Sequence, residues 1–260
     1  MDIVQQFYNN LAGQYDRLFR DWDASVSEQA AILDRLFSGC GFDRSARILD
    51  CACGIGTQAI GLAALGYPVT ASDFSDAALG QAAERAAKHG VSVRFAHADF
   101  RRLAEVFSEQ YDIVIAMDNA LPHMLTAADL EIAVRSMTGR VRKGGIFAAS
   151  IRDYDVLLAE KPPYSPPYIH QTEHGRRVSF QTWDWAGENY HLVQYIIEDG
   201  ETLSVSKYDC AYRAVRRAEL TELLYAAGCA EVIWKMPEES GYYQPVVIAE
   251  KIKGNRRISL

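Results

Sequence analysis

Acidic residues and glycines occur where short apolar runs of the chain end. Residues 47–58 read Arg-Ile-Leu-Asp-Cys-Ala-Cys-Gly-Ile-Gly-Thr-Gln: an apolar run ends on Asp50, and a turn with Gly54 and Gly56 follows. Glycine adopts positive φ angles and lets the backbone approach a ligand that a Cβ would exclude. The second apolar run ends on Asp73, where a carboxylate can accept both hydroxyls of a ribose. Together these features predict a binding site for a ligand that contains adenosine.

The same acids help to choose between adenosine-containing ligands. A carboxylate at Asp50 would repel a pyrophosphate, whereas it would attract a sulfonium ligand that also carries an ammonium group. The third apolar run ends in Asp99 and Phe100, where the acid can accept a hydrogen bond from an adenine amino group. The dinucleotide fingerprint has a third glycine where this chain has Ala59, although alanine is tolerated there. The pattern therefore favours S-adenosylmethionine and leaves NAD as the weaker alternative.

A sheet must bring the ends of these runs together. Between residues 46 and 151, short apolar runs alternate with amphipathic segments. The predicted strands are 47–52, 67–72, 91–96, 111–117 and 145–151, and the predicted helices are 57–65, 76–88 and 126–142. This alternation predicts an α/β fold with a doubly wound, mostly parallel sheet. Right-handed crossovers put the loops that follow the strands on one edge, so we expect Asp50, Asp73, Asp99 and Asp118 to lie along it.

Other segments flank this core on both sides. Residues 1–45 contain two predicted helices, at 3–20 and 26–38. Four prolines between residues 162 and 167 interrupt the chain, and three runs of β character follow at 177–185, 190–198 and 202–212. We expect these runs to form a small antiparallel β insertion over 160–213. A helix at 216–227 and strands at 229–236 and 243–251 then return to the core, which we assign to 46–159 and 214–252, before a tail at 253–260.

Composition argues against several classes of function. The 260 residues carry a formal net charge of −7, which is unsuited to following nucleic-acid phosphates. The five cysteines lack paired Cys-x2-Cys spacing and the six histidines are scattered, so we expect no metal site. No segment has the length and apolarity of a membrane span, and the first residues do not read as a signal peptide. We expect a cytoplasmic protein with a small-molecule substrate, without nucleic-acid or membrane partners; a homo-oligomer stays open.

Four segments together resemble the class I S-adenosylmethionine-dependent methyltransferases: Leu-Asp-Cys-Ala-Cys-Gly-Ile-Gly-Thr, Ser-Asp-Phe-Ser, Ala-Asp-Phe and Tyr-Asp-Ile-Val-Ile-Ala-Met-Asp-Asn. The resemblance implies a Rossmann-like, seven-stranded sheet with an antiparallel last strand, and S-adenosylmethionine as the cofactor. It implies that Gly54 and Gly56 approach the methionyl part, Asp73 the ribose, and Asp99 with Phe100 the adenine, on which Phe74 would pack. Further expected cofactor contacts are Asp50, Ala52 (where many members have glycine), Met117 and Tyr15.

A closer resemblance is to the glycine/sarcosine N-methyltransferases. Asp118-Asn119-Ala-Leu-Pro-His123 is similar to their Gly-Asn-Ser-x-x-His segment. Ser-Ile-Arg-Asp-Tyr-Asp at 150–155 is similar to their His-Arg-Asn-Tyr-Asp, whose arginine grips the substrate carboxylate. The resemblance implies N-methylation of an amino acid or related carboxylate-bearing amine, with Asn119, His123 and Arg152 at the acceptor. It also implies that residues 1–45 form a helical lid and that the β insertion caps the substrate.

Several alternatives stay open at the level of sequence. His123 can instead be a packed histidine, and Arg152 can instead form a surface salt bridge with Asp153 or Asp155. The arginine that holds the cofactor carboxylate in the family has no clear match here, although Arg17 or Arg20 can substitute. The alternative functions are O-methylation of a small phenol or carboxylate, a non-methylating use of S-adenosylmethionine, and cofactor binding without catalysis.

Overall fold

The computed structural model describes residues 3–173 and 175–252, and the predicted tail at 253–260 lies outside this part. A seven-stranded sheet with the order β10-β11-β5-β4-β1-β2-β3 forms the core. Its strands are β1 (Ile48–Asp50), β2 (Val69–Asp73), β3 (Val93–His97), β4 (Tyr111–Ala116), β5 (Val141–Ser150), β10 (Cys229–Lys235) and β11 (Val246–Lys251). β1 to β5 pair in parallel, and β11 is antiparallel to both β5 and β10. The predicted fold class is confirmed.

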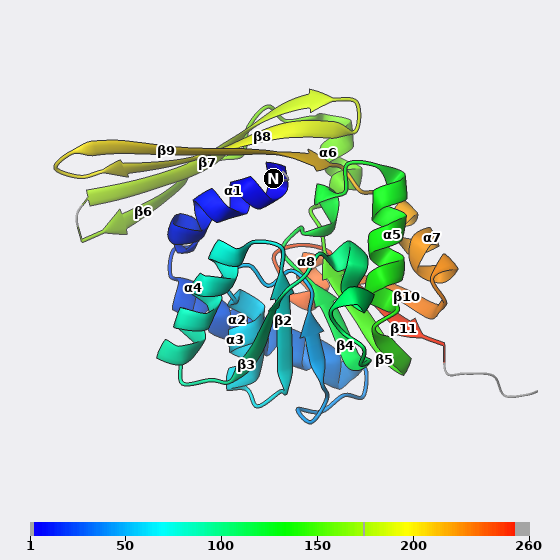
Figure 1. Cartoon of the computed structure of the whole chain (residues 1–260). Coiled ribbons are helices and arrows are strands. Elements are labelled where there is room, and N and C mark those ends of the chain that lie inside the picture. Colours follow the sequence, from blue (N-terminus) through cyan, green and yellow to red (C-terminus); the bar gives the residue numbers. More distant parts are fainter. Residues whose placement is uncertain (1–2, 174, 253–260) are drawn as a thin grey trace, which may run out of the picture.

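Helices cover both faces of this sheet, as Figure 1 shows. On one face lie α2 (Trp22–Gly39), α3 (Thr57–Ala64) and α4 (Asp76–Lys88), and on the other lie α5 (Ala127–Thr138) and α7 (Arg217–Ala226). The alternation of β4 explains the two cores, since successive strand residues point to opposite faces. Ile113 and Ile115 pack with Leu33 of α2, whereas Val114 packs with Leu130 of α5 and Leu220 of α7.

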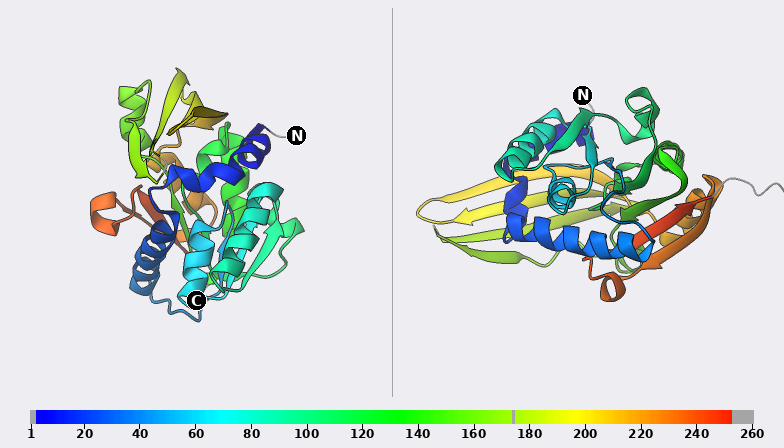
Figure 2. Two further views of the ribbon diagram at one scale, coloured as in Figure 1. Left: turned by 90° about the vertical axis from the view of Figure 1, so that its left-hand side faces the viewer. Right: turned by 90° about the horizontal axis from the view of Figure 1, so that it is seen from below.

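A second sheet, of four antiparallel strands, lies over the carboxyl edge of the first (Figures 1 and 2). It contains β6 (Tyr168–Thr172), β7 (Gly175–Ala186), β8 (Asn189–Asp199) and β9 (Leu203–Arg213). The sequence predicted three of these strands and missed β6. This strand has only five residues, directly after the proline-rich segment, and it forms by pairing with β7, where His170 lies opposite Arg177.

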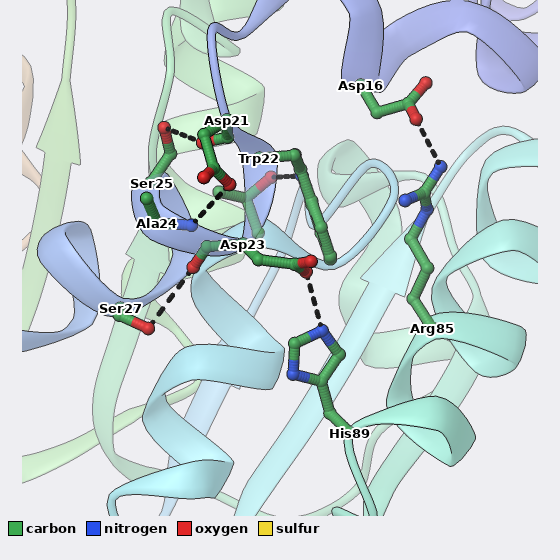
Figure 3. A network of polar contacts seen from close by, with 10 residues as sticks. Asp16, Asp21, Trp22, Asp23, Ala24, Ser25, Ser27, Arg85 and His89 are labelled. Atoms are coloured by element: carbon green, nitrogen blue, oxygen red, sulfur yellow. Dashed lines mark hydrogen bonds and ion pairs between the residues drawn. The ribbon is translucent and has the colours of Figure 1, made fainter. Parts of the chain in front are cut away.

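The N-terminal segment runs between the two sheets. α1 (Ile3–Leu11) contacts β9 and α4, and a 3₁₀ helix, η1 (Ala12–Leu18), takes the place of the continuous helix predicted to residue 20. Figure 3 shows how the end of this segment is fixed: Asp16 pairs with Arg85 at 3.4 Å, and Asp23 with His89 at 3.0 Å. The carboxylate of Asp21 accepts from the Ala24 amide and so caps α2.

Four short elements complete the described part of the chain. They are η2 (Phe100–Glu105), η3 (Leu121–His123), α6 (Tyr154–Glu160) and α8 (Pro237–Ser240). η3 follows β4 and α6 follows β5, so both lie near the carboxyl edge of the main sheet. Within 3–173 and 175–252, none of the helices combines the length and apolar composition needed to cross a bilayer.

Candidate active site

A cavity of about 490 Å³ lies at the carboxyl ends of β1 to β4. Its wall contains nine of the residues predicted from sequence: Tyr15, Ala52, Gly54, Asp73, Phe74, Asp99, Phe100, Met117 and His123. Two predicted cofactor residues, Asp50 and Gly56, lie outside this wall. Gly56 has a φ of 93° at the start of α3, and a Cβ there would lie 2.8 Å from Cδ1 of Ile60. Its glycine is therefore explained by the turn and by the packing of α3.

Asp73 connects the glycine turn to the loop after β2. Its Oδ2 accepts the Gly54 amide at 2.8 Å and its Oδ1 accepts the Ser75 amide at 2.9 Å. Burial raises the pKa of Asp73, and these backbone hydrogen bonds oppose that effect. A carboxylate has about four lone-pair sites, so both oxygens keep the capacity to accept from a ligand hydroxyl.

Asp99 is held by an arginine that the sequence analysis did not single out. Nε of Arg101 donates to both carboxylate oxygens at 2.8–3.0 Å, and Nη2 lies 2.7 Å from Oδ2. Both residues line the cavity. Arg101 lies two residues after Asp99, the N-cap of η2, and this spacing is the signal that could have identified it.

Asp50 is fully buried below the glycine turn. Its Oδ1 accepts the Ala52 amide at 3.3 Å, whereas its Oδ2 has no hydrogen-bond partner within residues 3–173 and 175–252. Burial raises the pKa of this carboxyl to about 8, with a smaller contribution from Asp73. Asp50 is therefore mostly protonated at neutral pH, and the carboxylates of Asp73 and Asp118 give this end of the sheet its negative character. That character fits a cationic sulfonium ligand and is unsuited to a pyrophosphate.

A second cavity, of about 740 Å³, adjoins the first and shares Tyr8, Tyr15 and Asp118 with it. Asn119 and Arg152 line this second cavity, together with four glutamines from distant segments: Gln29, Gln181, Gln194 and Gln244. His123 lines the first cavity instead. The three predicted acceptor residues are therefore close in the fold but divided between two adjoining cavities, which we call the cofactor cavity and the acceptor cavity.

Arg152 is bound by neutral side chains. Its Nη1 donates to the Tyr190 hydroxyl at 3.0 Å and its Nη2 donates to Oε1 of Gln181 at 2.9 Å. The guanidinium also lies over the rings of Trp183 and Tyr212, at 5.0 and 5.6 Å from their centres. In the described part of the chain, Arg152 forms no ion pair.

The alternative interpretation of Arg152, a salt bridge with Asp153 or Asp155, is wrong. Both acids pair with Arg217 of α7 instead, at 2.7 and 3.0 Å. The reason is that Asp153 caps α6, and its carboxylate therefore faces the helix end and α7. Arg152 is left facing the acceptor cavity.

Asn119 has a strained backbone and one unused donor. Its φ is 67°, in the left-handed region. Oδ1 accepts from the Arg152 amide at 3.1 Å and from the Tyr154 hydroxyl at 3.0 Å. Nδ2 is buried and has no hydrogen-bond partner among the residues that the structure describes. An unpaired buried amide is costly, and such groups in native structures occur at functional sites.

His123 is a packed histidine. Its Nε2 lies 2.8 Å from the Tyr8 hydroxyl, and its ring lies 4.2 Å from that of Tyr212. Burial lowers the pKa of His123 to about 3, and the charge of Arg152 adds to this effect. His123 is therefore neutral at physiological pH and connects α1 to β9.

The two arginines considered for the cofactor carboxylate lie elsewhere. Arg17 forms an ion pair with Glu198 of β8 at 3.5 Å, and Arg20 lines the acceptor cavity. Neither contributes to the wall of the cofactor cavity.

The geometry agrees with comparisons to known proteins. Residues 48–145 match the family described as methyltransferase domain. A glycine/sarcosine N-methyltransferase from Aphanothece halophytica is 22% identical over 245 residues, which cover 92% of this chain and 85% of that protein. A glycine/sarcosine N-methyltransferase from Parasynechococcus marenigrum is 28% identical over 59% of this chain and 53% of that protein.

Solved structures share the fold. A sugar N-methyltransferase from a Streptoalloteichus species has a TM-score of 0.74 at 16% identity, with 92% of each chain covered. An amino pentose methyltransferase from Micromonospora echinaspora, solved with S-adenosylmethionine bound, has a TM-score of 0.71 at 18% identity and covers 87% of this chain and 92% of that one. With the matched domain, the sheet order and the cofactor cavity, these findings show that the chain is a class I S-adenosylmethionine-dependent methyltransferase.

Proposed function

We propose that this enzyme N-methylates a small amine that also carries a carboxylate. The observation that carries the proposal is Arg152, a guanidinium on the wall of the acceptor cavity with no acidic partner among the described residues. A cation held only by neutral groups in a low-dielectric site favours an anionic ligand, and guanidinium binds carboxylates in a bidentate manner. The unused Nδ2 of Asn119 supplies a further donor beside it.

In this proposal the residues of the chain hold and align the two reactants. The cofactor, when bound, supplies a methyl group activated by a positively charged sulfur. Asp73 and the glycine turn hold it in the cofactor cavity, and Arg152 with Asn119 orients the acceptor in the adjoining cavity. The N-terminal segment and the β6–β9 sheet cover the junction and exclude water, which favours an in-line displacement.

An amino sugar is a second candidate acceptor. The acceptor cavity, at about 740 Å³, is large for glycine, and its glutamines suit a ligand with several hydroxyls. Two proteins with the same fold are named as methyltransferases of an amino pentose and of a sugar nitrogen. The amine remains the nucleophile in either case, and the two candidates differ in what Arg152 would bind.

An acceptor screen tests the proposal. The formation of S-adenosylhomocysteine should be measured with glycine, sarcosine, larger amino acids, their carboxamides and amino sugars. We expect turnover with a carboxylate-bearing amine, and a loss of about a hundredfold in kcat/KM in Arg152→Ala, since one charge-assisted bidentate contact is removed. Amides accepted as well as acids, with Arg152→Ala unchanged, would contradict the carboxylate and leave the amino sugar.

A further inference from the structure

Asp118 lies at the boundary between the cofactor cavity and the acceptor cavity. It follows the end of β4 and lines both cavities. Tyr8 and Tyr15 are shared in the same way, but they bring neutral hydroxyls, whereas Asp118 brings a carboxylate. A methyl group that moves from one cavity to the other therefore passes close to Asp118.

The backbone at Asp118 adopts a conformation that suits glycine. Its φ is 54°, and that of the following Asn119 is 67°. A residue with a Cβ in this left-handed region costs about 1 kcal/mol or more, and such residues concentrate at functional sites. Aspartate tolerates this region better than most residues with a Cβ, so the backbone admits Asp118 without requiring its carboxylate.

Neutral donors hold the Asp118 carboxylate. Nε2 of Gln58 donates to Oδ2 at 2.7 Å, and the Tyr243 hydroxyl donates to Oδ1 at 2.9 Å. The Tyr242 hydroxyl also donates to Oδ1, and Gln29 fixes both Gln58 and Tyr242. Within residues 3–173 and 175–252, Asp118 has no ion pair. A partly buried carboxylate without a counter-ion favours a cationic ligand beside it.

We propose that Asp118 binds the ammonium group of the acceptor and takes its proton before methyl transfer. The inference rests on the proposed N-methylation and assigns the proton acceptor of that reaction. One N–H bond breaks and an O–H bond forms on Asp118, which leaves a lone pair on the nitrogen. That lone pair forms a bond to the methyl carbon while the carbon–sulfur bond breaks and its electron pair stays on sulfur. The positive charge thus passes from sulfur to the methylated nitrogen, and Asp118 returns its proton to water.

The alternative base, His123, is poorly suited to this step. Burial lowers the pKa of His123 to about 3, so a proton taken from an ammonium would be held weakly. Burial acts in the opposite direction on a carboxyl: it raises the pKa of Asp118, although the hydrogen bonds from Tyr242, Gln58 and Tyr243 oppose the effect. A carboxylate whose pKa lies above its usual value is the better acceptor of a proton near neutral pH.

Other ionisable groups also face this position. The hydroxyls of Tyr15, Tyr242 and Tyr243 have pKa values raised by burial and then by the charge of Asp118, so they stay neutral and act as donors. The carboxyls of Asp50 and Asp73 lie on the same edge of the sheet, and Arg152 provides the nearby positive charge on the acceptor side. Any pH dependence assigned to Asp118 must be compared with that of a variant that lacks its carboxylate.

Sinefungin tests the assignment without a known acceptor. This analogue of the cofactor carries an amine at the place where S-adenosylmethionine carries the transferred methyl group. Calorimetry should give dissociation constants for sinefungin and S-adenosylhomocysteine with the wild type, Asp118→Asn and Asp118→Gly, of which the glycine variant suits the left-handed backbone. We expect both variants to bind sinefungin about tenfold more weakly, as befits a lost charge-assisted contact, and S-adenosylhomocysteine within about twofold of the wild type. Asp76→Asn, which removes an exposed carboxylate beside His97, is the matched control and should change neither constant.

The pH dependence of sinefungin binding, and the loss of affinity of each variant for each ligand, distinguish the possible outcomes. The affinity of the wild type for sinefungin should fall relative to S-adenosylhomocysteine as the pH falls through the pKa of Asp118, because the protonated acid loses its charge. This fall should be absent in Asp118→Asn. The assignment would be overturned if the Asp118 variants lost affinity for both ligands equally, or lost affinity for neither. A wild type that discriminates between the ligands as expected, but methylates no amine in the acceptor screen, would count against the proposed function alone.

Discussion

The cofactor cavity and the acceptor cavity differ in how their walls are built. In the cofactor cavity the acidic side chains follow the ends of parallel strands, and backbone amides hold them: Gly54 and Ser75 donate to Asp73, and Arg101 donates to Asp99. In the acceptor cavity side chains from distant segments hold one another, as when Gln181 of β7 and Tyr190 of β8 bind Arg152 after β5. The first wall depends on local sequence and the second on long-range packing.

This difference has consequences for specificity. A wall held by backbone amides keeps its shape when neighbouring side chains change, so it suits a ligand that stays the same across a family. A wall made of side-chain pairs changes its chemistry with single substitutions. Asp118 and Asn119 lie at the junction of the two cavities and depend on both local and distant structure. Their backbone angles are strained, and their side chains bind partners from α3, α6 and the loop before β11.

The largest effect expected from this comparison concerns the cofactor cavity. Asp73→Ala should weaken the binding of S-adenosylhomocysteine about a hundredfold, because it removes the proposed acceptor of the ribose hydroxyls and leaves the Gly54 and Ser75 amides without their partner. Calorimetry measures the change, and Asp76→Ala, three residues further on and exposed, is the control. A loss below about threefold would show that the wall does not depend on this carboxylate.

A smaller effect is expected when one side-chain pair of the acceptor cavity is changed. In Gln181→Glu the new carboxylate lies beside the Arg152 guanidinium, at the 2.9 Å contact now made by the amide oxygen. The internal ion pair should compete with the acceptor and raise the KM for a carboxylate-bearing amine about tenfold.

Two controls make this experiment specific. S-Adenosylhomocysteine should bind to Gln181→Glu as it does to the wild type, since Gln181 lines only the acceptor side. Gln194→Glu changes the neighbouring glutamine, whose Oε1 accepts from Gln181 and which does not bind Arg152. If Gln194→Glu raises the KM as much as Gln181→Glu does, the effect is a general one of added charge and the Arg152 pair is not its cause.

The two walls also explain how much could be predicted from sequence. The order of strands and helices follows from hydrophobic alternation. Eight predicted cofactor residues lie on the wall of the cofactor cavity: seven are close in sequence to a strand end, and Tyr15 comes from η1. Asp50 was expected on that wall, but it lies at the end of a three-residue strand whose side chains are all buried. The residue types can be read from the sequence, whereas the direction in which each side chain points cannot.

The acceptor cavity was less predictable for the same physical reason. Arg152 was singled out from its segment, but its partners Gln181 and Tyr190 lie in the β insertion, and no local pattern indicates which of its polar residues face inward. β6 was missed because a five-residue strand exists only through its pairing with β7. Asp118 was recognised as one of the acids on the edge, but its position between two cavities depends on where α1 and the loop before β11 pack.

The smallest effect expected concerns His123, which joins α1 to the second sheet through contacts with Tyr8 of α1 and Tyr212 of β9. Burial lowers its pKa in the folded state to about 3, whereas the unfolded chain has the usual value of 6.5. Between these values the unfolded state binds the additional proton, so the free energy of unfolding should decrease as the pH falls from 6.5 toward 3, by about 1 kcal/mol per pH unit. Chemical denaturation at several pH values measures this slope. His123→Phe should reduce the slope by this amount, while His191→Phe, at an exposed position on β8, should leave it in place. An unchanged slope in His123→Phe would mean that the histidine is not held neutral at the junction, and that α1 is not fixed to the second sheet through this contact.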